Sequence, residues 1–422
     1  MSVALLTDRY ELTMVQAALA GGKADRPCVF EVFARHLPAG RRYGVVAGTA
    51  RVIEAVQDFR FNQDQLDYLS KEKIVDETTL DWLSNYRFSG NISGYREGEL
   101  YFGNSPVLTI EGGFAEAVVL ETVILSILNF DSAVASAAAR MRSAASNRFL
   151  AEMGSRRTHE QAAVSAARAA YLVGFDATSN LEAGAKYGIP TMGTSAHSFT
   201  LLHDSEDQAF EAQLKALGNN TTLLVDTFDV ERAVRKAVEL SNGKVGAVRL
   251  DSGDLVQSAI EVRALLDSLG ATNTKITVTS DLDEYTIAAL AQAPVNSYGV
   301  GTSLVTGSGH PTAGFVYKLV SHFDGEDWVD VAKKSVNKSS RGGKKSASRV
   351  LESGKASREL IGHPSTGREL QVDLMLNGIS QISDQRTALQ AAREHHVLAL
   401  AELSASALRL SKGEPAIPSE FV

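Results

Sequence analysis

The chain has 422 residues, of which 44% are hydrophobic and 22% charged, and its formal net charge is −8. This length can bury a large core in two or three domains, and the negative charge argues against binding to nucleic acid. Cys28 is the only cysteine, which excludes an internal disulfide and fits a reducing, cytoplasmic compartment. We expect no signal peptide, because Asp8, Arg9 and Glu11 interrupt the N-terminus, and no membrane span, because no apolar run approaches the required length.

The first 115 residues or so are predicted to be mixed and rich in strands. Apolar segments at 28–33, 91–95 and 105–110 alternate with turn residues and indicate a separate domain. A long apolar helix is predicted from 121 to 141. We expect a break in this helix near residues 129–131, where polar residues interrupt the apolar run.

Between residues 174 and 305 a short apolar strand and a helix alternate repeatedly. Helices with a 3.6-residue apolar period are predicted at 206–217, 229–240, 254–269 and 283–291. Strand ends are predicted at 175–176, 192–194, 224–226, 250–251, 279–281 and 300–302. Repeated strand–helix units indicate a parallel sheet, closed or open. Each strand ends in Asp, Ser, Thr or Gly, and such a succession favours the rim of one barrel pocket over scattered helix caps.

One strand–loop–helix unit, from 246 to 269, carries the most informative loop. An apolar run ends at Asp251, and Ser252 and Gly253 separate this residue from Asp254. Two carboxylates at the carboxyl end of a strand could hold ribose hydroxyls or a metal-bound pyrophosphate. The alternative is that Asp254 caps the helix while Ser252 and Gly253 form the turn. These four residues by themselves favour neither interpretation.

Three further motifs contain candidate binding or catalytic residues. Gly301 and Thr302 follow an apolar turn and offer backbone N–H groups to a phosphate. Arg156 and Arg157 could clamp a carboxylate or phosphate, although adjacent arginines are more often surface charges. His197 follows a strand end among small residues, yet a lone histidine is more often structural. A Walker-type phosphate loop and a complete dinucleotide fingerprint are both missing from the sequence, which argues against those classes.

After residue 315 the pattern returns to strands, predicted at 314–320 and 328–332. A basic segment rich in Ser and Gly follows at 333–349 and is either a solvated loop or a loop that faces phosphate. A polar-faced helix is predicted from 384 to 410. His395 and His396 are adjacent in it and so lie on different faces, which indicates surface positions rather than ligands.

Six motifs make the chain resemble the nicotinate phosphoribosyltransferase family. They lie at residues 6–14 (LTDRYELTM), 154–157 (GSRR), 174–180 (GFDATSN), 193–199 (GTSAHSF), 249–254 (RLDSGD) and 298–303 (YGVGTS). The resemblance covers most of the chain, and the motifs occur in the family's order. That agreement is far more specific than any one motif.

The resemblance implies an α/β fold, with an irregular α/β barrel and a second, smaller strand-rich α+β domain built from N- and C-terminal segments. The implied boundaries are 1–118 with 315–400 for the smaller domain, 119–314 for the barrel and 401–422 for a C-terminal tail. The implied reaction joins nicotinate and 5-phosphoribosyl 1-pyrophosphate to give nicotinate mononucleotide and pyrophosphate, the first step of NAD salvage from nicotinate. ATP is hydrolysed to ADP and phosphate through a phosphohistidine, with Mg²⁺ as cofactor. A homodimer with shared active sites is also implied.

The resemblance also assigns roles to individual residues. His197 corresponds to the phosphorylated histidine, Asp251 is catalytic, and Tyr10 would stack on the pyridine from a second subunit. The other implied nicotinate-binding residues are Arg156, Arg157, Asp176, Thr194 and Ser195. Those implied for phosphoribosyl pyrophosphate are Arg249, Asp251, Ser252, Gly253, Asp254, Ser280, Gly301 and Thr302, with Asp254 also a Mg²⁺ ligand.

The sequence departs from the family pattern at two places. Met153 stands where relatives commonly have an aromatic residue before Gly154, so ring stacking from that side is lost. Gly342 and Gly343 precede Lys344 where relatives often have Pro-Gly, and the loop is expected to be more mobile. The alternatives are a nicotinamide-specific enzyme of the same fold, a phosphoribosyltransferase with a Rossmann-like sheet, whose Thr-Gly-Gly-Thr loop is missing, and a non-catalytic barrel homologue.

Overall fold

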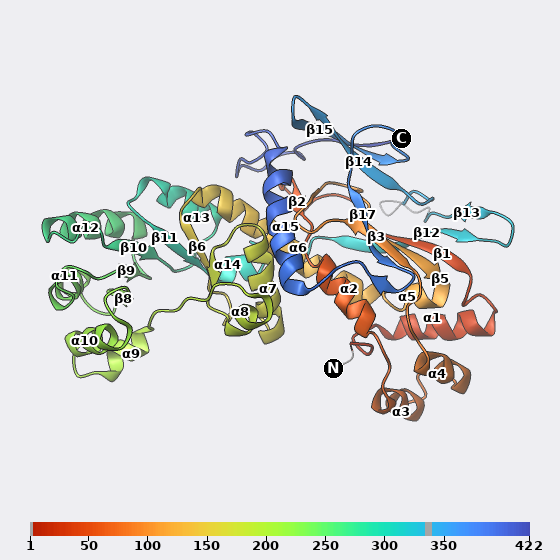
Figure 1. The fold of residues 1–422 in the computed structure, drawn as a ribbon, viewed down its shortest axis with the longest axis horizontal. Helices are drawn as coiled ribbons and strands as arrows, with labels where there is room; N and C mark the ends of the chain where they lie inside the picture. The colour runs from red at the N-terminus through yellow and green to blue at the C-terminus, as the bar shows by residue number, and fades with distance from the viewer. Residues whose placement is uncertain (1–2, 334–339) are drawn as a thin grey trace. The chain divides into compact units, whose positions relative to one another are not determined.

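The computed structural model of the protein describes residues 3–333 and 340–422. The chain divides into two compact units. Ala137–Gly309 is called the parallel-sheet unit, and Met1–Ser136 with His310–Val422 is called the antiparallel unit. Each unit has its own sheets and its own core (Figure 1).

The parallel-sheet unit is built from six short strands and the helices between them. The strands are β6 (Phe149–Glu152), β7 (Ala177–Thr178), β8 (Thr222–Leu224), β9 (Ala247–Leu250), β10 (Lys275–Val278) and β11 (Ser297–Val300). The helices are α7 (Glu160–Leu172), α8 (Leu181–Tyr187), α9 (His197–Leu202), α10 (Glu206–Leu217), α11 (Val230–Leu240), α12 (Leu255–Ser268), α13 (Glu284–Ala289), the 3-10 turn η1 (Leu290–Gln292) and α14 (Thr302–Val305). All strands run parallel in the order β7-β6-β11-β10-β9-β8, which forms a half-barrel and confirms the α/β class.

Side-chain caps set the beginnings of the helices in this unit. Ser205 caps α10, Asp229 caps α11 and Asp254 caps α12, each by accepting a backbone N–H from the first turn. The helices predicted at 206–217, 229–240 and 254–269 are therefore confirmed to within one residue. Because the strands are parallel, their carboxyl ends meet at one edge of the sheet.

Two predicted strand ends are misplaced. The segment at 192–194 follows no strand, because only an isolated bridge joins Thr178 to Thr191 there. Pro190 has no N–H to donate to a longer ladder. The end predicted at 175–176 instead precedes β7, and the sequence analysis misses β6.

The antiparallel unit is the longer of the two and joins both ends of the chain. Its helices are α1 (Arg9–Ala20), α2 (Thr49–Asp58), α3 (Gln63–Lys71), α4 (Glu77–Ser84), α5 (Phe114–Val118), α6 (Glu121–Ala145), which continues into the other unit, and α15 (Gln385–Ala401). Its strands are β1 (Pro27–Ala34), β2 (Gly44–Val45), β3 (Asn91–Tyr95), β4 (Leu100–Tyr101), β5 (Leu108–Gly113), β12 (Phe315–Phe323), β13 (Trp328–Asp330), β14 (Ser346–Glu352), β15 (Lys355–Gly362), β16 (Arg368–Glu369), β17 (Gln371–Leu376), β18 (Ile379–Ser380) and β19 (Ser419–Phe421).

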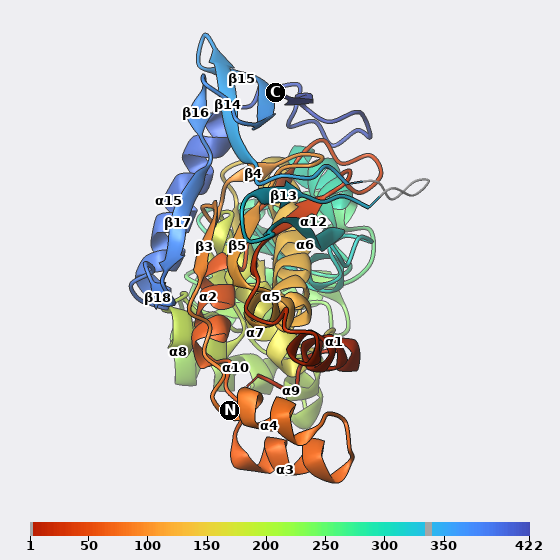
Figure 2. The same ribbon diagram turned by 90° about the vertical axis from the view of Figure 1, so that its right-hand side faces the viewer.

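Segments far apart in the sequence share the sheets of this unit. The largest sheet has the order β13-β12-β1-β5-β3-β17-β18 and only antiparallel pairs. Figure 2 shows the blue β17 beside the orange β3, and Gln371 lies opposite Tyr95 in that pair. The other sheets are β16-β14-β15-β19 and β2-β4. The expected strand-rich domain of N- and C-terminal segments is thus confirmed, but it is the longer unit and not the smaller one that was predicted.

The predicted break in the long helix is absent, and α6 is continuous. Asp131 accepts two hydrogen bonds from Arg51, at 2.7 and 2.8 Å. Asn129 accepts the backbone N–H of Phe315 at 2.8 Å. Both polar side chains are satisfied by neighbouring segments, so the helix has no need to break at them.

The expectation that no apolar run reaches membrane-spanning length is also corrected. Residues 114–145 are long and apolar enough by length and composition alone. Within the fold, however, 61% of the most apolar window of this segment is buried. Such burial is characteristic of a core helix in a folded protein.

The sequence analysis does not predict the three short helices α2, α3 and α4. α3 buries only Leu69, so it lacks the apolar stripe that reveals a helix in a sequence. Its start is nevertheless set locally, by a capping box between Asn62 and Gln65. Asp76 caps α4 in a similar way.

Near the C-terminus, two predictions about the helix at 384–410 are wrong. α15 ends at Ala401, and His396 is not a surface residue, because only 3% of it is exposed. Its Nδ1 lies 2.9 Å from the carbonyl oxygen of Gly98, and burial lowers the pKa of His396 to about 4. A helix face that appears polar in sequence is here packed against the loop before β4.

A buried group of charges connects the strands of the antiparallel unit. We call Arg349, Glu99, Glu359, Arg368 and His395 the Arg349 cluster. Arg349 is fully buried and pairs with Glu99 at 2.5 Å and with Glu359 at 2.7 Å. Glu99 also accepts from Arg368 and meets His395 Nε2, both at 2.9 Å. Burial alone would raise the pKa of Glu99, but its hydrogen bonds and the two arginines lower it overall.

The predicted basic segment at 333–349 falls partly on residues 334–339, outside the described residues. In the described part, Lys344 pairs with Glu111 at 2.7 Å and Lys345 with the buried Glu31 at 2.8 Å. These two lysines therefore have structural partners within the antiparallel unit. β14 begins directly after them.

Candidate active site

A cavity of about 620 Å³ lies at the carboxyl edge of the parallel sheet. It lies within the parallel-sheet unit, and residues that follow β6, β7, β9, β10 and β11 contribute to its wall. The predicted site residues in its lining are Arg156, Arg157, Thr194, Ser195, His197, Arg249, Asp251, Ser280, Gly301 and Thr302. Residues spread over 147 positions of sequence, from Arg156 to Thr302, therefore meet at one place because parallel strands end there.

His197 begins α9 and is 40% exposed to the cavity. Its Nδ1 lies 3.1 Å from Thr227 Oγ1, so one ring nitrogen has a hydrogen-bond partner. Its Nε2 lies 3.8 Å from Asp226 Oδ1 and 3.8 Å from Asp251 Oδ2. The imidazole thus has a hydroxyl on one side and two carboxylates on the other.

Asp226 follows β8 and holds the neighbouring loop in place. Its Oδ2 accepts the backbone N–H of Asp251 at 2.8 Å and the hydroxyl of Ser252 at 2.7 Å. Its Oδ1 is buried and has no hydrogen-bond partner among the described residues. An unpaired carboxylate oxygen is costly in a folded protein, so this atom is available to a ligand or ion.

Arg249 and Asp251 lie on the same strand–loop segment. Arg249 donates to Thr194 Oγ1 at 2.7 Å and to the carbonyl oxygen of Ser195 at 3.2 Å, which fixes the loop before His197. Its NH2 is 3.9 Å from Asp251 Oδ2. Burial lowers the pKa of Arg249, although the neighbouring carboxylates favour its charged form.

The loop that carries Arg156 and Arg157 rests on the buried carboxyl group of Glu152, the last residue of β6. Thr178 Oγ1 donates to Glu152 at 2.5 Å, and the backbone N–H of Gly154 donates to its other oxygen. Burial raises the pKa of Glu152. A Cβ at Gly154 would lie 2.3 Å from Val305 Cγ1, so only glycine fits there. The arginine pair is thereby held at the cavity rim.

The opposite wall contains a strained residue and closely packed backbone. Ser280 has a φ of 106°, a conformation that non-glycine residues rarely adopt and that clusters at functional sites. A Cβ at Gly299 would meet Met153 Sδ at 2.6 Å. Met153 therefore fills the space in front of Gly299 and lines the cavity with a thioether.

The structure does not bring five of the predicted residues into the cavity lining. Asp176 accepts the backbone N–H of Leu150 at 2.8 Å and lies 3.3 Å from Arg142, at the start of β6 rather than its end. Asp254 caps α12 through the N–H of Gln257. Ser252 binds Asp226, and Gly253 supplies a turn with φ 81°. The fifth residue, Tyr10, lies on α1 of the antiparallel unit and is 46% exposed there.

Asp226, Thr227 and Glu152 help to shape the cavity and were not among the candidates. Asp226 and Thr227 follow a predicted strand end, and the same rule that selected Asp251 could have found them. Glu152 ends a strand that the sequence analysis misses. No local signal connects Glu152 to Thr178, because their contact depends on the pairing of β6 with β7.

The carboxylate oxygens of the site indicate whether it could bind Mg²⁺. The described residues contain no group of three or more His, Cys, Asp or Glu residues that could hold a metal ion. The free Oδ1 of Asp226 and the Oδ2 of Asp251 both lie near His197 Nε2. Mg²⁺ is usually bound by one or two carboxylates together with water and substrate phosphates, and this pair suits that arrangement.

Sequence models of two domains match the chain. The nicotinate phosphoribosyltransferase N-terminal domain matches residues 5–129, and the nicotinate phosphoribosyltransferase family model matches residues 149–375. The chain belongs to the nicotinate phosphoribosyltransferase family.

Relatives of this family agree over nearly the whole chain. A nicotinate phosphoribosyltransferase of Mycobacterium tuberculosis is 53% identical over 99% of this chain and 95% of its own length. One from Bacillus subtilis is 36% identical over 83% of this chain and 74% of its own. The crystal structure of human nicotinic acid phosphoribosyltransferase matches with a TM-score of 0.83 and 25% identity, over 98% of both chains. The fold of the chain is therefore that of the family.

Proposed function

We propose that the protein transfers the phosphoribosyl group of 5-phosphoribosyl 1-pyrophosphate to nicotinate, with coupled hydrolysis of ATP. The observation that carries this proposal is the position of His197. In a chain of this family, it lies in a cavity between a hydroxyl and two carboxylates and shares that cavity with Arg156, Arg157 and Arg249. The same cavity therefore offers a phosphate acceptor and cationic groups for anionic substrates.

The transfer step forms one bond and breaks another. The lone pair of the pyridine nitrogen attacks C1 of the ribose while the bond from C1 to the pyrophosphate oxygen breaks and pyrophosphate leaves with that electron pair. The ribose passes through an oxocarbenium-like state, so the anion of Asp251 would stabilise the developing positive charge. Gly301 and Thr302 would bind the 5-phosphate through backbone N–H groups and a hydroxyl. Thr194 and Ser195 lie beside the same space.

Recognition of nicotinate would depend on its carboxylate. Arg156 and Arg157 are exposed at the cavity rim, and a guanidinium can make paired, charge-assisted hydrogen bonds to a carboxylate. Nicotinamide offers an uncharged amide in the same position, which is why we propose nicotinate rather than nicotinamide as substrate.

ATP would phosphorylate His197. A ring nitrogen of His197 would attack the γ-phosphorus, with ADP as leaving group. Phosphorylation adds nearly two negative charges and three acceptor oxygens, which would order nearby cationic loops around the second substrate. Hydrolysis of the phosphohistidine would then release phosphate and return these loops to their earlier, less ordered state.

Mg²⁺, when bound, would neutralise the charge of the departing pyrophosphate. Asp226 and Asp251 would hold it together with substrate oxygens. The alternative ligand Asp254 is exposed, and one of its oxygens is already used as a helix cap. An Asp254 role in metal or ribose binding stays a prediction.

Two further expectations belong to the same proposal. We propose a homodimer with shared active sites, for which the support is the exposure of Tyr10 in a unit other than the one that holds the cavity. We also propose a cytoplasmic location, supported by a single buried free thiol, Cys28.

A direct assay tests the proposal. The protein is incubated with Mg²⁺ and phosphoribosyl pyrophosphate, with nicotinate or nicotinamide, and with or without ATP, and the mononucleotides are separated. Nicotinate mononucleotide should form, faster and further with ATP. Equal turnover of both pyridines would reject the substrate assignment, and no product from either would support a non-catalytic homologue.

A further inference from the structure

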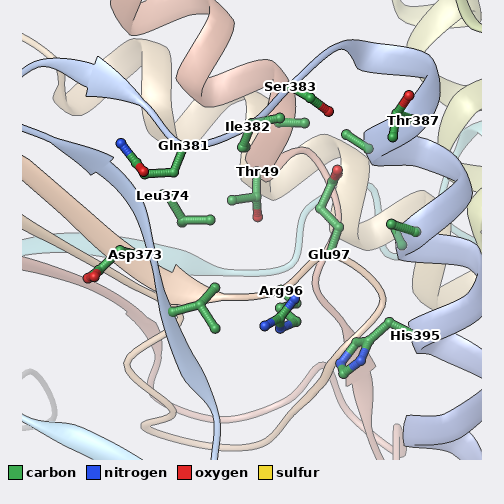
Figure 3. A pocket seen from close by; sticks show the side chains of 15 residues that line it. Thr49, Arg96, Glu97, Asp373, Leu374, Gln381, Ile382, Ser383, Thr387 and His395 are labelled. Atoms are coloured by element: carbon green, nitrogen blue, oxygen red, sulfur yellow. The ribbon is translucent and has the colours of Figure 1, made fainter.

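A cavity within the antiparallel unit has a volume of about 330 Å³ and contains charges of both signs (Figure 3). Arg96 lies in its lining together with Glu97 and Asp373, so this lining does not select a ligand by charge. The candidate active site differs, because the two carboxylate oxygens of Asp251 there have different surroundings. One oxygen is held by a neighbouring hydroxyl, and the other has only longer contacts.

That hydroxyl belongs to Thr279, which directly follows β10 just as Asp251 directly follows β9. The two strands pair in parallel with Val278 opposite Leu250, and the backbone N–H of Thr279 donates to the Leu250 carbonyl oxygen at 2.9 Å. Thr279 belongs to the cavity lining, although only 5% of the residue is exposed. The sheet therefore places a nearly buried hydroxyl beside the carboxylate that we assign to the transfer step.

The proton of this hydroxyl has one good acceptor. Thr279 Oγ1 donates to Asp251 Oδ1. The other acceptor nearby, the carbonyl oxygen of Leu250, is 3.5 Å away and already accepts the Thr279 N–H. Hydrogen bonds to a carboxylate are shorter and stronger than those to a neutral group, so the Asp251 oxygen is favoured.

The methyl group of Thr279 fixes the direction of the hydroxyl. Threonine is branched at Cβ, so its first side-chain torsion is restricted. A Cβ at Gly299 would lie 2.7 Å from Thr279 Cγ2, which means that the methyl group occupies the space that this glycine leaves open. Contact between the methyl group and β11 therefore helps to hold Oγ1 toward Asp251.

The second oxygen of Asp251 is not held in this way. Oδ2 lies 3.8 Å from His197 Nε2 and 3.9 Å from Arg249 NH2, and both distances are too long for a hydrogen bond. The side chain is 33% exposed, and the terminal torsion of an aspartate has a broad energy minimum. A carboxylate without an anchor could thus turn toward Arg249 and form a closer ion pair with it.

We propose that Thr279 is a positioning residue for the transfer step. By holding Oδ1 of Asp251, it keeps Oδ2 available to the oxocarbenium-like ribose and prevents the carboxylate from pairing with Arg249. Thr279 acts through Asp251 and does not touch the reacting atoms. This inference rests on the proposed pentosyl transfer and adds a residue to it.

The test is steady-state kinetics of the full-length protein with nicotinate, phosphoribosyl pyrophosphate, Mg²⁺ and ATP. Thr279→Val keeps the shape of the side chain but removes the donor, and it should lower kcat about 10- to 100-fold, as expected for a misplaced catalytic group. The KM for nicotinate should change by less than about twofold, because Arg156 and Arg157 are assigned to the pyridine carboxylate. Thr279→Ser retains the donor and should keep kcat within about threefold of the unmodified protein.

Thr277→Val is the matched control, on the same strand and at 6% exposure. The Thr277 hydroxyl lies 2.7 Å from Ser297 Oγ, and Thr277 does not belong to the cavity lining. The two valine variants should lose similar melting temperature, because each removes one buried hydroxyl and its hydrogen bond. Only Thr279→Val should lower kcat.

An Asp251→Ala background supplies the second readout. Thr279→Val added to Asp251→Ala should lower kcat by less than about twofold further, since there is no carboxylate left to position. The inference is overturned if Thr279→Val has a normal kcat, if Thr279→Ser is impaired as strongly as Thr279→Val, or if Thr279→Val lowers kcat equally in both backgrounds. Failure of the unmodified protein to form nicotinate mononucleotide would instead reject the proposed function, and this inference with it.

Discussion

The Arg349 cluster and the His197 cavity contain the same kinds of side chain but differ in how these are satisfied. In the cluster, Arg349 lies 2.5–2.8 Å from the carboxylates of Glu99 and Glu359 and from the Leu100 carbonyl oxygen, all of them buried. In the cavity, His197 stands 3.8 Å from two carboxylates, and Asp226 Oδ1 has no partner in the described chain. The carboxylate oxygens of the cluster are all paired and serve the fold, although Arg349 Nε and Arg368 Nε have no partner in the described chain, whereas the cavity leaves a carboxylate oxygen available to a substrate.

The largest expected effect is on the cluster. Arg349→Met should destabilise the antiparallel unit by about 3–5 kcal/mol, because it leaves Glu99 and Glu359 buried without their partner. Thermal or urea unfolding measures the change. Arg358→Met, on a partly exposed arginine of the neighbouring β15, is the control and should change stability by less than about 1 kcal/mol. Equal stability of the two variants would contradict a structural role for the cluster.

The same cluster should make stability sensitive to acid. The pKa of Glu99 is lowered in the fold, so its contribution is fully present above the ordinary glutamate pKa of 4.5 and is lost as the pH falls below that value toward the folded pKa. The melting temperature should therefore drop between pH 5 and pH 3, and Glu99→Gln should flatten that dependence. An unchanged slope in the variant would assign the acid sensitivity to other carboxylates.

The next prediction concerns the activity of the candidate active site and not the stability of the fold. Asp251→Asn should reduce pentosyl transfer by about 10²- to 10³-fold with little change in melting temperature, because its charge faces the cavity. Asp229→Asn is the matched control, since Asp229 caps α11, does not line the cavity, and asparagine also caps helices well. Near-normal activity of Asp251→Asn, or an equal loss in both variants, would break this distinction between the two carboxylates.

A smaller effect is expected at the cavity rim. Arg156→Ala should raise the KM for nicotinate by about 10- to 150-fold, which corresponds to the loss of a charged hydrogen bond of about 1.5–3 kcal/mol. Steady-state kinetics with nicotinate and nicotinamide measure it. The discrimination between the two pyridines should shrink in parallel, and unchanged discrimination would place the carboxylate elsewhere.

Local signals explain which parts of this arrangement the sequence could predict. Asp229 and Asp254 each cap a helix with an apolar stripe, so α11 and α12 could be located from sequence to within one residue. His197 and Asp251 could be selected because both belong to family motifs. The sequence also correctly separated the parallel sheet from the strand-rich regions, because strand–helix alternation is a repeated local pattern.

Contacts that depend on strand order could not be predicted in this way. Asp226 reaches the Asp251 backbone because β8 lies beside β9, and no local pattern encodes that neighbourhood. His396 was predicted at the surface because the loop that buries it, at Gly98, lies 298 residues away in the sequence. Asp176 belongs to a family motif, yet it binds the start of β6 and does not line the cavity.

The most direct test of the account is phosphate labelling of His197. The protein is incubated with ATP labelled at the γ-phosphate, and acid-labile protein-bound phosphate is measured alongside ATP-coupled transfer. His197→Ala should lose both while it keeps a weak, ATP-independent transfer with poorer affinity for phosphoribosyl pyrophosphate. The control His203→Ala, just after the same helix α9, should keep the label. If His197→Ala still accumulates acid-labile phosphate and still couples ATP to product, the histidine is structural and the proposed mechanism is wrong.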